Sequence, residues 1–387
     1  MVFKTYKMND MKGKQGLVCM GLLLVLSSCH TGKQITASGL QRKDFQTEVN
    51  GQHTDLFTLS NKQGMEVCIT NYGARVVSIL VPDRNGKRED VVCGFSTITE
   101  YMEQRQNFGS TVGRYIGRIL NARFTLDGVE YKLVPNNGKS GHISHGGNPG
   151  FADRIWKVEQ ADTHRVRLSY LSPDGENGFP GNLKVTLVYS LGEDDNALDL
   201  TYEATTDAPT VLNLSHHSFF NISGNFTKSV EDQQLWVDAD RFTPYDDKKC
   251  VTGEYLPVAG TPLDFRMPHT IGECIDADHP QLKVVNGYDH TWELNTKGDD
   301  TRPAAWVYDP ASGRKMEIFT TEPGMQIYTG NGLKGKMTGK GGIAYPFRSA
   351  VCFETMHFQD SPNQPGFPST VLRPGEVFRS HTVYKFE

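Results

Sequence analysis

Short segments in which polar and apolar residues alternate dominate most of the chain. The alternation is clear at Met65–Thr70, Arg165–Tyr170, Lys184–Tyr189 and Ala197–Ala204. Successive side chains of a strand point to opposite faces of a sheet, so this period is typical of half-buried strands. The pattern therefore predicts β-structure along most of the chain, with one face of each strand turned toward a core.

Clusters of turn-forming residues separate these segments. They are rich in Asp, Asn, Pro and Gly and occur at residues 83–86, 127–128, 136–138, 173–175 and 309–313. Such clusters favour tight connections between antiparallel strands. No amphipathic run is long enough to predict a helix. We therefore expect an all-β fold, with one large antiparallel β domain over residues 46–387.

The N-terminus has a different character. Four lysines precede an apolar run at residues 16–26, which ends in Leu26-Ser-Ser-Cys29. A basic head, a short apolar stretch and small residues are typical of a secretory signal, and the run is shorter than the roughly 20 residues of a membrane span. Because the ending resembles the bacterial lipobox, we predict a signal peptide at residues 1–28 and a lipid on Cys29. A plain signal peptide with an incidental cysteine is the alternative.

Residues 29–45 are polar and lack periodicity, so we expect a tether between the lipid and the domain. The protein would then be exported and anchored in the bacterial envelope. The residues after Cys29 lack an acidic run, which favours a side facing the periplasm. This anchor is the only membrane association that we expect.

Composition narrows the range of partners. The chain has 387 residues, 37% hydrophobic and 22% charged, which is ordinary for a globular protein. Its net charge of -5 gives no basic field for nucleic acid, so no nucleic-acid partner is expected. The 7 cysteines have wide, irregular spacing without a zinc motif. We expect the cysteines of the domain to be buried free thiols, although a single disulfide remains possible.

Two segments contain candidate catalytic residues. Glu354 lies in an apolar, strand-like segment, where a carboxylate either pairs with an arginine or acts as a base of raised pKa. His216 and His217 are neighbours, and on a strand they would point to opposite faces, so they cannot easily share a metal ion. We expect one of them to face a cleft, and we predict no metal site and no cofactor.

The order of several motifs makes the chain recognisable. Over residues 50–387 it resembles the aldose 1-epimerase (galactose mutarotase) family. The motifs that carry the resemblance are GRYIGRI (113–119), SHGG (144–147), HHSFFN (216–221), TPLDFR (261–266), GMQIYTGN (324–331), FETMHF (353–358) and LRPGE (372–376). The resemblance implies a large antiparallel β-sandwich with a sugar cleft on a concave face.

The resemblance also implies roles for individual residues. Glu354 matches the general base and His217 the general acid, while His145 matches a histidine that contacts the sugar near its ring oxygen. The residues that match binders of sugar hydroxyls are Arg118, Asp264 and Gln326. Gly117 is a departure within the same binding motif, because many members carry Asn there, and it leaves the sugar preference open. His142 falls outside the matched positions and is expected to be structural.

The implied function is interconversion of the α- and β-anomers of a free aldose by acid–base ring opening and closure. A monosaccharide is then the expected partner. Three alternatives stay open: a hexose-6-phosphate epimerase, which needs a basic cluster for the phosphate; a non-catalytic carbohydrate-binding lipoprotein; and a glycoside hydrolase or lyase, of which hydrolases usually need two nearby carboxylates.

Overall fold

A computed structural model gives the fold of residues 34–387. The predicted signal peptide and Cys29 lie outside these described residues. Among the described residues, no helix is both long and apolar enough to cross a membrane.

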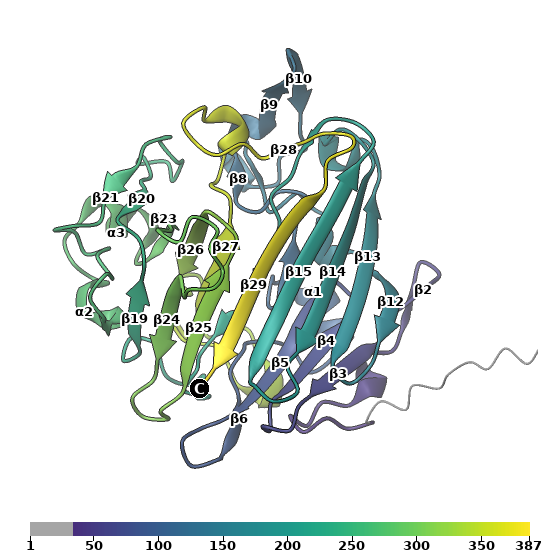
Figure 1. Ribbon diagram of the computed structural model, residues 1–387, viewed down its shortest axis with the longest axis vertical. Coiled ribbons are helices and arrows are strands. Elements are labelled where there is room, and N and C mark those ends of the chain that lie inside the picture. The colour runs from purple at the N-terminus through teal and green to yellow at the C-terminus, as the bar shows by residue number, and fades with distance from the viewer. Residues whose placement is uncertain (1–33) are drawn as a thin grey trace, which may run out of the picture. The chain divides into compact units, whose positions relative to one another are not determined.

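The largest sheet has nine strands, and each pairs antiparallel with its neighbours. Figure 1 shows its long strands β13, β14, β15 and β29 side by side. In spatial order the strands are β12 (Lys157–Ala161), β13 (Arg165–Ser172), β14 (Leu183–Leu191), β15 (Ala197–Thr206), β29 (Phe378–Phe386), β25 (Lys315–Thr320), β24 (Ala305–Tyr308), β19 (Gln234–Val237) and β22 (His269–Thr270).

Two smaller sheets are also antiparallel. The six-stranded sheet contains β18 (Phe219–Phe220), β27 (Val351–Met356), β26 (Gly324–Tyr328), β23 (Asp289–Glu293), β20 (Arg241–Thr243) and β21 (Leu256–Pro257). The four-stranded sheet contains β3 (Leu56–Ser60), β4 (Glu66–Thr70), β5 (Arg75–Pro82) and β6 (Arg88–Asp90).

Short strand pairs and helices complete the described chain. The pairs are β1 (Glu48–Val49) with β2 (Gln52–His53), β7 (Ser110–Val112) with β17 (Ser215–His217), β8 (Arg118–Ile119) with β11 (Ile143–Ser144), β9 (Arg123–Leu126) with β10 (Val129–Lys132), and β16 (Thr210–Val211) with β28 (Val371–Leu372). The α-helices are α1 (Ile98–Gln104), α2 (Ile271–Cys274) and α3 (Pro280–Val285). Helix α1 begins with a capping box between Thr97 and Glu100, a local signal that periodicity alone does not reveal.

The inward side chains of the nine-stranded sheet share one hydrophobic core with the other two sheets. Along β14 and β15, buried positions alternate with more exposed ones, as the sequence pattern predicts. The core joins Leu187 and Leu200 of these strands to Ile327 and Phe353 of the six-stranded sheet and to Ile69 of the four-stranded sheet. The sheets therefore form an antiparallel sandwich, which confirms the predicted all-β fold class.

Strand β4 differs from its prediction, because all five of its residues are buried. One face packs in the main core, while the other is covered by the segment that precedes β1. Glu66 accepts hydrogen bonds from the backbone N–H groups of Ala37 and Ser38, at 2.7 and 3.3 Å. Leu40 and Phe45 of that segment are buried as well. The expected boundary at residue 46 is therefore wrong, since residues 36–45 pack on the domain instead of forming a tether.

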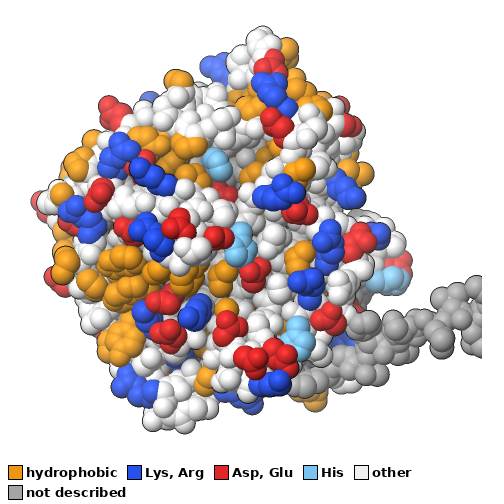
Figure 2. All heavy atoms as spheres, viewed as in Figure 1, with side chains coloured by type: hydrophobic (Ala, Val, Ile, Leu, Met, Phe, Trp, Pro, Cys, Tyr) orange, Lys and Arg blue, Asp and Glu red, His pale blue; other side chains and the backbone are white. Residues whose placement is uncertain are grey.

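The surface mixes both signs of charge. Figure 2 shows Lys and Arg side chains interspersed with Asp and Glu on the face viewed. Of the five cysteines among the described residues, Cys274 is partly exposed and the other four are buried, and all five are free thiols. The expectation of buried free thiols is thus confirmed except at Cys274.

Candidate active site

Aligned side chains of β23, β26 and β27 form one wall of a cleft. Thr291, Gln326 and Glu354 stand directly opposite one another across the three strands. Asp289 and Tyr328 form the next row, two residues further along. Because residues two apart on a strand share a face, both rows point to the same side of the six-stranded sheet. Antiparallel register therefore brings acids and amides from distant parts of the sequence into one surface.

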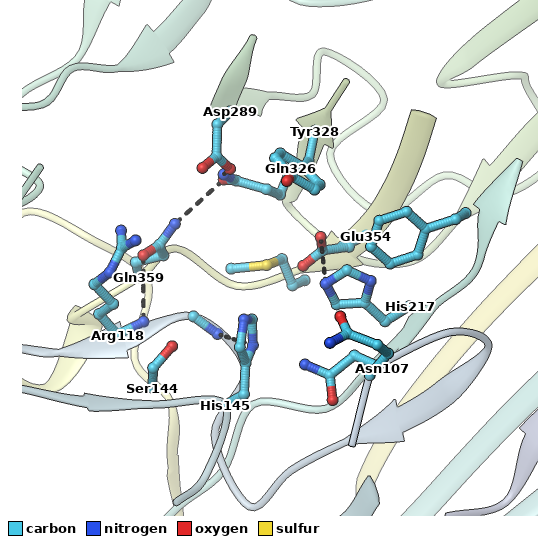
Figure 3. Close-up of a pocket in the computed structure, with 14 residues that line it drawn as sticks. Asn107, Arg118, Ser144, His145, His217, Asp289, Gln326, Tyr328, Glu354 and Gln359 are labelled. Atoms are coloured by element: carbon cyan, nitrogen blue, oxygen red, sulfur yellow. Dashed lines mark hydrogen bonds and ion pairs between the residues drawn. The ribbon is translucent and has the colours of Figure 1, made fainter. Parts of the chain in front are cut away.

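Segments from the first half of the chain close the cleft. Strand β17 supplies His217, β8 supplies Arg118, and the turn after β11 supplies His145 (Figure 3). The cleft has a volume of about 240 Å³. Pockets for drug-sized ligands span roughly 300–1,000 Å³, so this one suits a single small, polar molecule.

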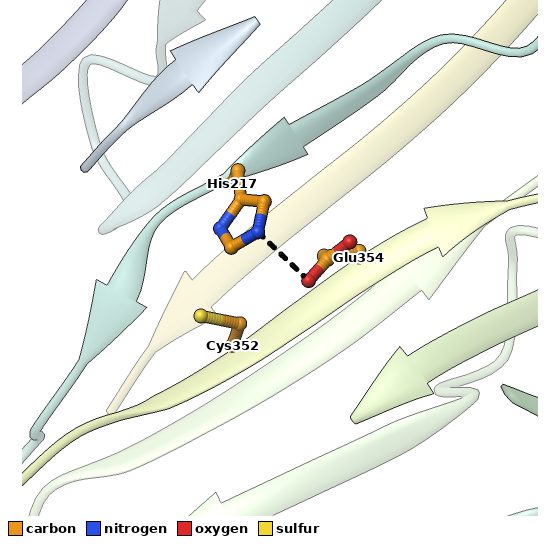
Figure 4. A group of neighbouring side chains, drawn as sticks. All are labelled: His217, Cys352 and Glu354. Atoms are coloured by element: carbon orange, nitrogen blue, oxygen red, sulfur yellow. Dashed lines mark ion pairs between the residues drawn. The ribbon is translucent and has the colours of Figure 1, made fainter. Parts of the chain in front are cut away.

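A close contact between Glu354 and His217 lies in this cleft. His217 Nε2 is 3.2 Å from a carboxylate oxygen of Glu354 (Figure 4), and the side chains are only 5% and 7% exposed for Glu354 and His217. Phe219 stacks on the His217 ring, with the ring centroids 5.1 Å apart. The sequence left open whether Glu354 pairs with an arginine. In the structure its partner is a histidine, His217.

Burial drives both members of this pair toward their neutral forms. It raises the pKa of Glu354 well above its ordinary value, and the nearby Asp289 carboxylate raises it further. Burial likewise lowers the pKa of His217 well below its ordinary value, and His145 adds to the effect. Two such groups in contact titrate as a unit. The pair therefore holds one proton across the neutral range.

His145 is a neutral hydrogen-bond donor beside this pair. Its Nδ1 accepts from the backbone N–H of Gly117 at 3.4 Å, so the ring proton is on Nε2. Burial lowers the pKa of His145 to about 4. The ring lies edge-on to His217, with centroids 5.5 Å apart. A neutral imidazole in this position can donate a hydrogen bond from Nε2 to an oxygen of the substrate.

The other end of the cleft carries hydrogen-bonding side chains of Gln326, Asp289 and Arg118. Gln326 Nε2 donates to Asp289 Oδ1 at 2.6 Å, and the Thr291 hydroxyl donates to Gln326 Oε1 at 2.5 Å. Arg118 lines the same cleft and uses one guanidinium nitrogen to donate to the Lys249 carbonyl at 3.3 Å. Carboxylate, amide and guanidinium groups together can accept from and donate to the hydroxyls of a sugar ring.

Comparison with known proteins identifies the family to which this chain belongs. The model of the aldose 1-epimerase family matches residues 55–385. The chain belongs to this family. Human galactose mutarotase is 39% identical over 323 residues, which cover 83% of this chain and 91% of the human protein. The aldose 1-epimerase of Escherichia coli is 36% identical over 339 residues, 87% of this chain and 96% of that protein.

Solved structures agree with the family assignment. An aldose epimerase homologue from C. elegans superposes with a TM-score of 0.79 at 31% identity, covering 86% of this chain and 99% of its own. A galactose 1-epimerase from Lactobacillus acidophilus gives a TM-score of 0.76 at 28% identity, covering 88% and 96%. The resemblance read from the ordered motifs is therefore confirmed, together with the sandwich that it implies.

Most of the predicted site residues of this family member meet in the cleft. The residues that line it include Glu354, His217, His145, Arg118, Gln326 and Gly117. Their placement agrees with the roles that the resemblance implies, and those roles remain predictions.

Asp264 is the exception, and its predicted role is wrong in this structure. It lies outside the residues that line the cleft, and its carboxylate receives two hydrogen bonds from Arg266, at 2.8 and 2.9 Å. The aspartate that lines the cleft is Asp289. The sequence gives no comparable signal for Asp289, because β23 reads Asp-His-Thr-Trp-Glu and a charged residue does not stand out there as Glu354 does in its apolar segment.

The two other histidines considered in the sequence, His216 and His142, have structural contacts. His216 Nε2 lies 2.6 Å from the Ser218 hydroxyl, and its ring packs against Tyr189 and Tyr384, away from Glu354. The two neighbouring histidines thus point to different sides, as predicted. His142 Nδ1 accepts from the backbone N–H of Asn121 at 2.9 Å and is not a cleft residue.

One group among the described residues has the ligand types for a metal ion. Potential ligand atoms of His217, Cys352 and Glu354 all lie within 4.8 Å of one another (Figure 4). Imidazole, thiolate and carboxylate ligands suit Zn²⁺. The sequence places only His216 and His217 side by side as metal-ligand candidates, because the approach of β17 to β27 is tertiary. A cation held here would occupy the atoms that the Glu354–His217 pair needs for proton transfer.

Proposed function

We propose that this family member interconverts the anomers of a free aldose, with Glu354 and His217 as the proton-transfer pair. The Glu354 carboxylate takes the proton of the anomeric hydroxyl while the His217 imidazolium gives one to the ring oxygen. The bond between C1 and the ring oxygen breaks, and an open-chain aldehyde forms. Rotation about C1–C2 presents the other face, and the reverse transfers close the ring.

The single observation that carries this proposal is the buried 3.2 Å contact between Glu354 and His217. Ring opening moves one proton on and one proton off the sugar, so the pair ends with as many protons as it began. A base and an acid that share one proton meet this requirement. Sugar hydroxyls that hydrogen-bond to Glu354 stabilise its carboxylate form and so prepare it to accept a proton.

The cleft supports this function better than its alternatives. Among the described residues that line it, Arg118 is the only lysine or arginine. One positive charge is too few to bind a phosphate group next to the carboxylates of Asp289 and Glu354. Asp289 does provide a second carboxylate, as a hydrolase would need, but it is hydrogen-bonded to Gln326, and Glu354 is paired with His217. A protein that only binds sugar has no need for this acid–base pair.

Polarimetry or exchange NMR on freshly dissolved α-anomers of several aldoses tests the proposal. We expect faster approach to anomeric equilibrium for at least one of them. The matched control is the methyl glycoside of the same sugar, whose anomeric oxygen carries no proton and which should remain unchanged. No acceleration for any aldose would contradict the enzyme proposal, and release of methanol from the glycoside would indicate a hydrolase.

We also propose that the protein is exported and carries a lipid on Cys29. The support is the basic and apolar leader that ends in Leu26-Ser-Ser-Cys29. Labelling with a radioactive or clickable fatty acid, followed by membrane fractionation, tests it. Cys29→Ser should abolish the label and release the protein from membranes. A membrane-bound, unlabelled wild type would show that the anchor is wrong.

A further inference from the structure

Gln359 occupies space that Gly117 leaves empty. Gly117 has a left-handed backbone with φ of 76°, and a Cβ built on it would lie 2.5 Å from Gln359 Cγ. This distance is far below van der Waals contact, and the nearest atoms belong to no other side chain. Both residues line the cleft. The missing side chain at position 117 therefore allows the Gln359 side chain to reach the cleft wall.

The orientation of the Gln359 amide is determined by a backbone group. The N–H of Arg118 can only donate, and it lies 3.2 Å from Gln359 Oε1. The Nε2 group must then point the other way, where it donates to the Tyr245 hydroxyl at 2.7 Å and to Gln326 Oε1 at 3.3 Å. The side chain is only 4% exposed, so water does not replace these bonds.

The orientation of the Gln359 amide also determines the orientation of the Gln326 amide. Gln326 Oε1 accepts from Gln359 and from Thr291, which leaves Gln326 Nε2 to donate to Asp289. If the Gln326 amide turned over, its oxygen would face the Asp289 carboxylate and its NH₂ would face that of Gln359. Buried polar groups without partners destabilise a structure, so the turned form is strongly disfavoured.

We propose that Gln359 is a positioning residue that fixes the hydroxyl-binding wall of the cleft, and that Gly117 makes its position possible. The chain of hydrogen bonds runs from the Arg118 backbone through Gln359 and Gln326 to Asp289. It ends on the carboxylate and amide that face the sugar and does not include the Glu354–His217 pair. Gln359 therefore controls sugar affinity and preference, while the proton transfers proceed without it. This inference rests on the proposed function.

Gln359→Met is the first test, because methionine keeps the length of the side chain and removes the amide. We expect KM for the best aldose to rise about tenfold or more, with kcat within about twofold of wild type. Gln160→Met is the matched control, since Gln160 is an exposed glutamine of β12 that does not line the cleft, and it should change neither constant. Thermal unfolding of each variant reports whether the fold is intact.

Gln359→Glu tests the same role through the pH dependence of KM, which a residue that only supports the fold would not change. The carboxylate keeps an acceptor for the Arg118 N–H but loses the donors to Tyr245 and Gln326. Protonation restores one donor, so KM of this variant should fall as the pH is lowered. The wild-type KM should not show this recovery.

The contact with Gly117 is tested by Gly117→Ala, alone and combined with Gln359→Ala. The alanine methyl displaces Gln359, so the two changes should raise KM less than the product of their single effects. Gly141→Ala is the control, because Gly141 has a similar φ of 70° and nothing within 4 Å of the added Cβ. It should strain the backbone without changing KM.

The outcomes separate this inference from the proposed function. A wild-type protein that accelerates no aldose would contradict the function and remove the basis of the inference. A wild type that is active, with KM unchanged in Gln359→Met and no pH-dependent recovery in Gln359→Glu, would overturn the inference alone.

Discussion

Asp289 and Glu354 face the same cleft from β23 and β27, the two strands that flank β26. The charge of Asp289 raises the pKa of Glu354 beyond the effect of burial. A carboxylate that lines the cleft thus favours the protonated form of the proposed base. The charge of Asp289 therefore extends the pH range over which Glu354 stays protonated.

Removal of either member of the proton-transfer pair should abolish catalysis. Glu354→Gln and His217→Asn keep the approximate shape of each side chain, and we expect each to lower kcat by about 10²–10⁴-fold with the fold intact. Polarimetry measures the rate, and circular dichroism checks the fold. A near-normal rate in either variant would show that the roles assigned to these residues are wrong.

Two aspartates should respond differently to the same substitution. Asp289→Asn removes a carboxylate from the cleft, so KM should rise by about tenfold or more. Asp264→Asn breaks a pair with Arg266 outside the cleft lining, so both KM and kcat should stay within about twofold of wild type. If Asp264→Asn alone raised KM, the sequence-based assignment would be right and the cleft described by the structure incomplete.

The rate should be constant over a wide range around neutral pH. Burial raises the pKa of Glu354 and lowers that of His217, so the pair keeps one proton between these two limits. Activity should fall at low pH, where a second proton binds, and at high pH, where the last one leaves. Asp289→Asn should shift the alkaline limb to lower pH, because it removes the charge that raises the pKa of Glu354. A single transition near the ordinary pKa of histidine would contradict this assignment.

His381 should make stability depend on pH. Hydrogen bonds to Asp199 and Asp300 raise its pKa to about 9 from the ordinary 6.5. A group whose folded pKa is raised stabilises the fold fully below its unfolded pKa, and this contribution disappears as the pH rises through the folded value. His381→Gln should therefore destabilise the protein by about 1–2 kcal/mol at pH 6 and by much less above pH 10. Denaturant unfolding at the two pH values measures the difference, and equal losses would contradict it.

Zinc ions should inhibit the enzyme by binding His217, Cys352 and Glu354. We expect inhibition that a chelator reverses and that saturating sugar weakens, since sugar and cation compete for the same atoms. Cys352→Ser should reduce the sensitivity to zinc by about tenfold or more, because it removes the thiolate ligand. Cys274→Ser is the control and should keep the wild-type sensitivity. Cadmium–thiolate absorbance gives a direct readout of binding, and equal sensitivity of both variants would show that Cys352 is not a ligand.

Local pattern was enough to predict much of the fold. The alternation in β13, β14 and β15 depends on side chains that point to opposite faces, a property of the strand itself. The fully buried β4 could not be predicted this way. Its second face is covered by Leu40 and Phe45, which look like part of a polar tether until their packing is known.

The sequence by itself determined the strand-rich fold class, the ordered motifs of the family and the identity of Glu354 and His217 as candidates, because these are properties of neighbouring residues. Only the tertiary structure decided which groups meet. Strand register placed Asp289 in the cleft instead of Asp264, and close approach of β17 to β27 paired His217 with Glu354. Distances and burial between segments far apart in the chain set pKa values and hydrogen bonds, and no local pattern contains them.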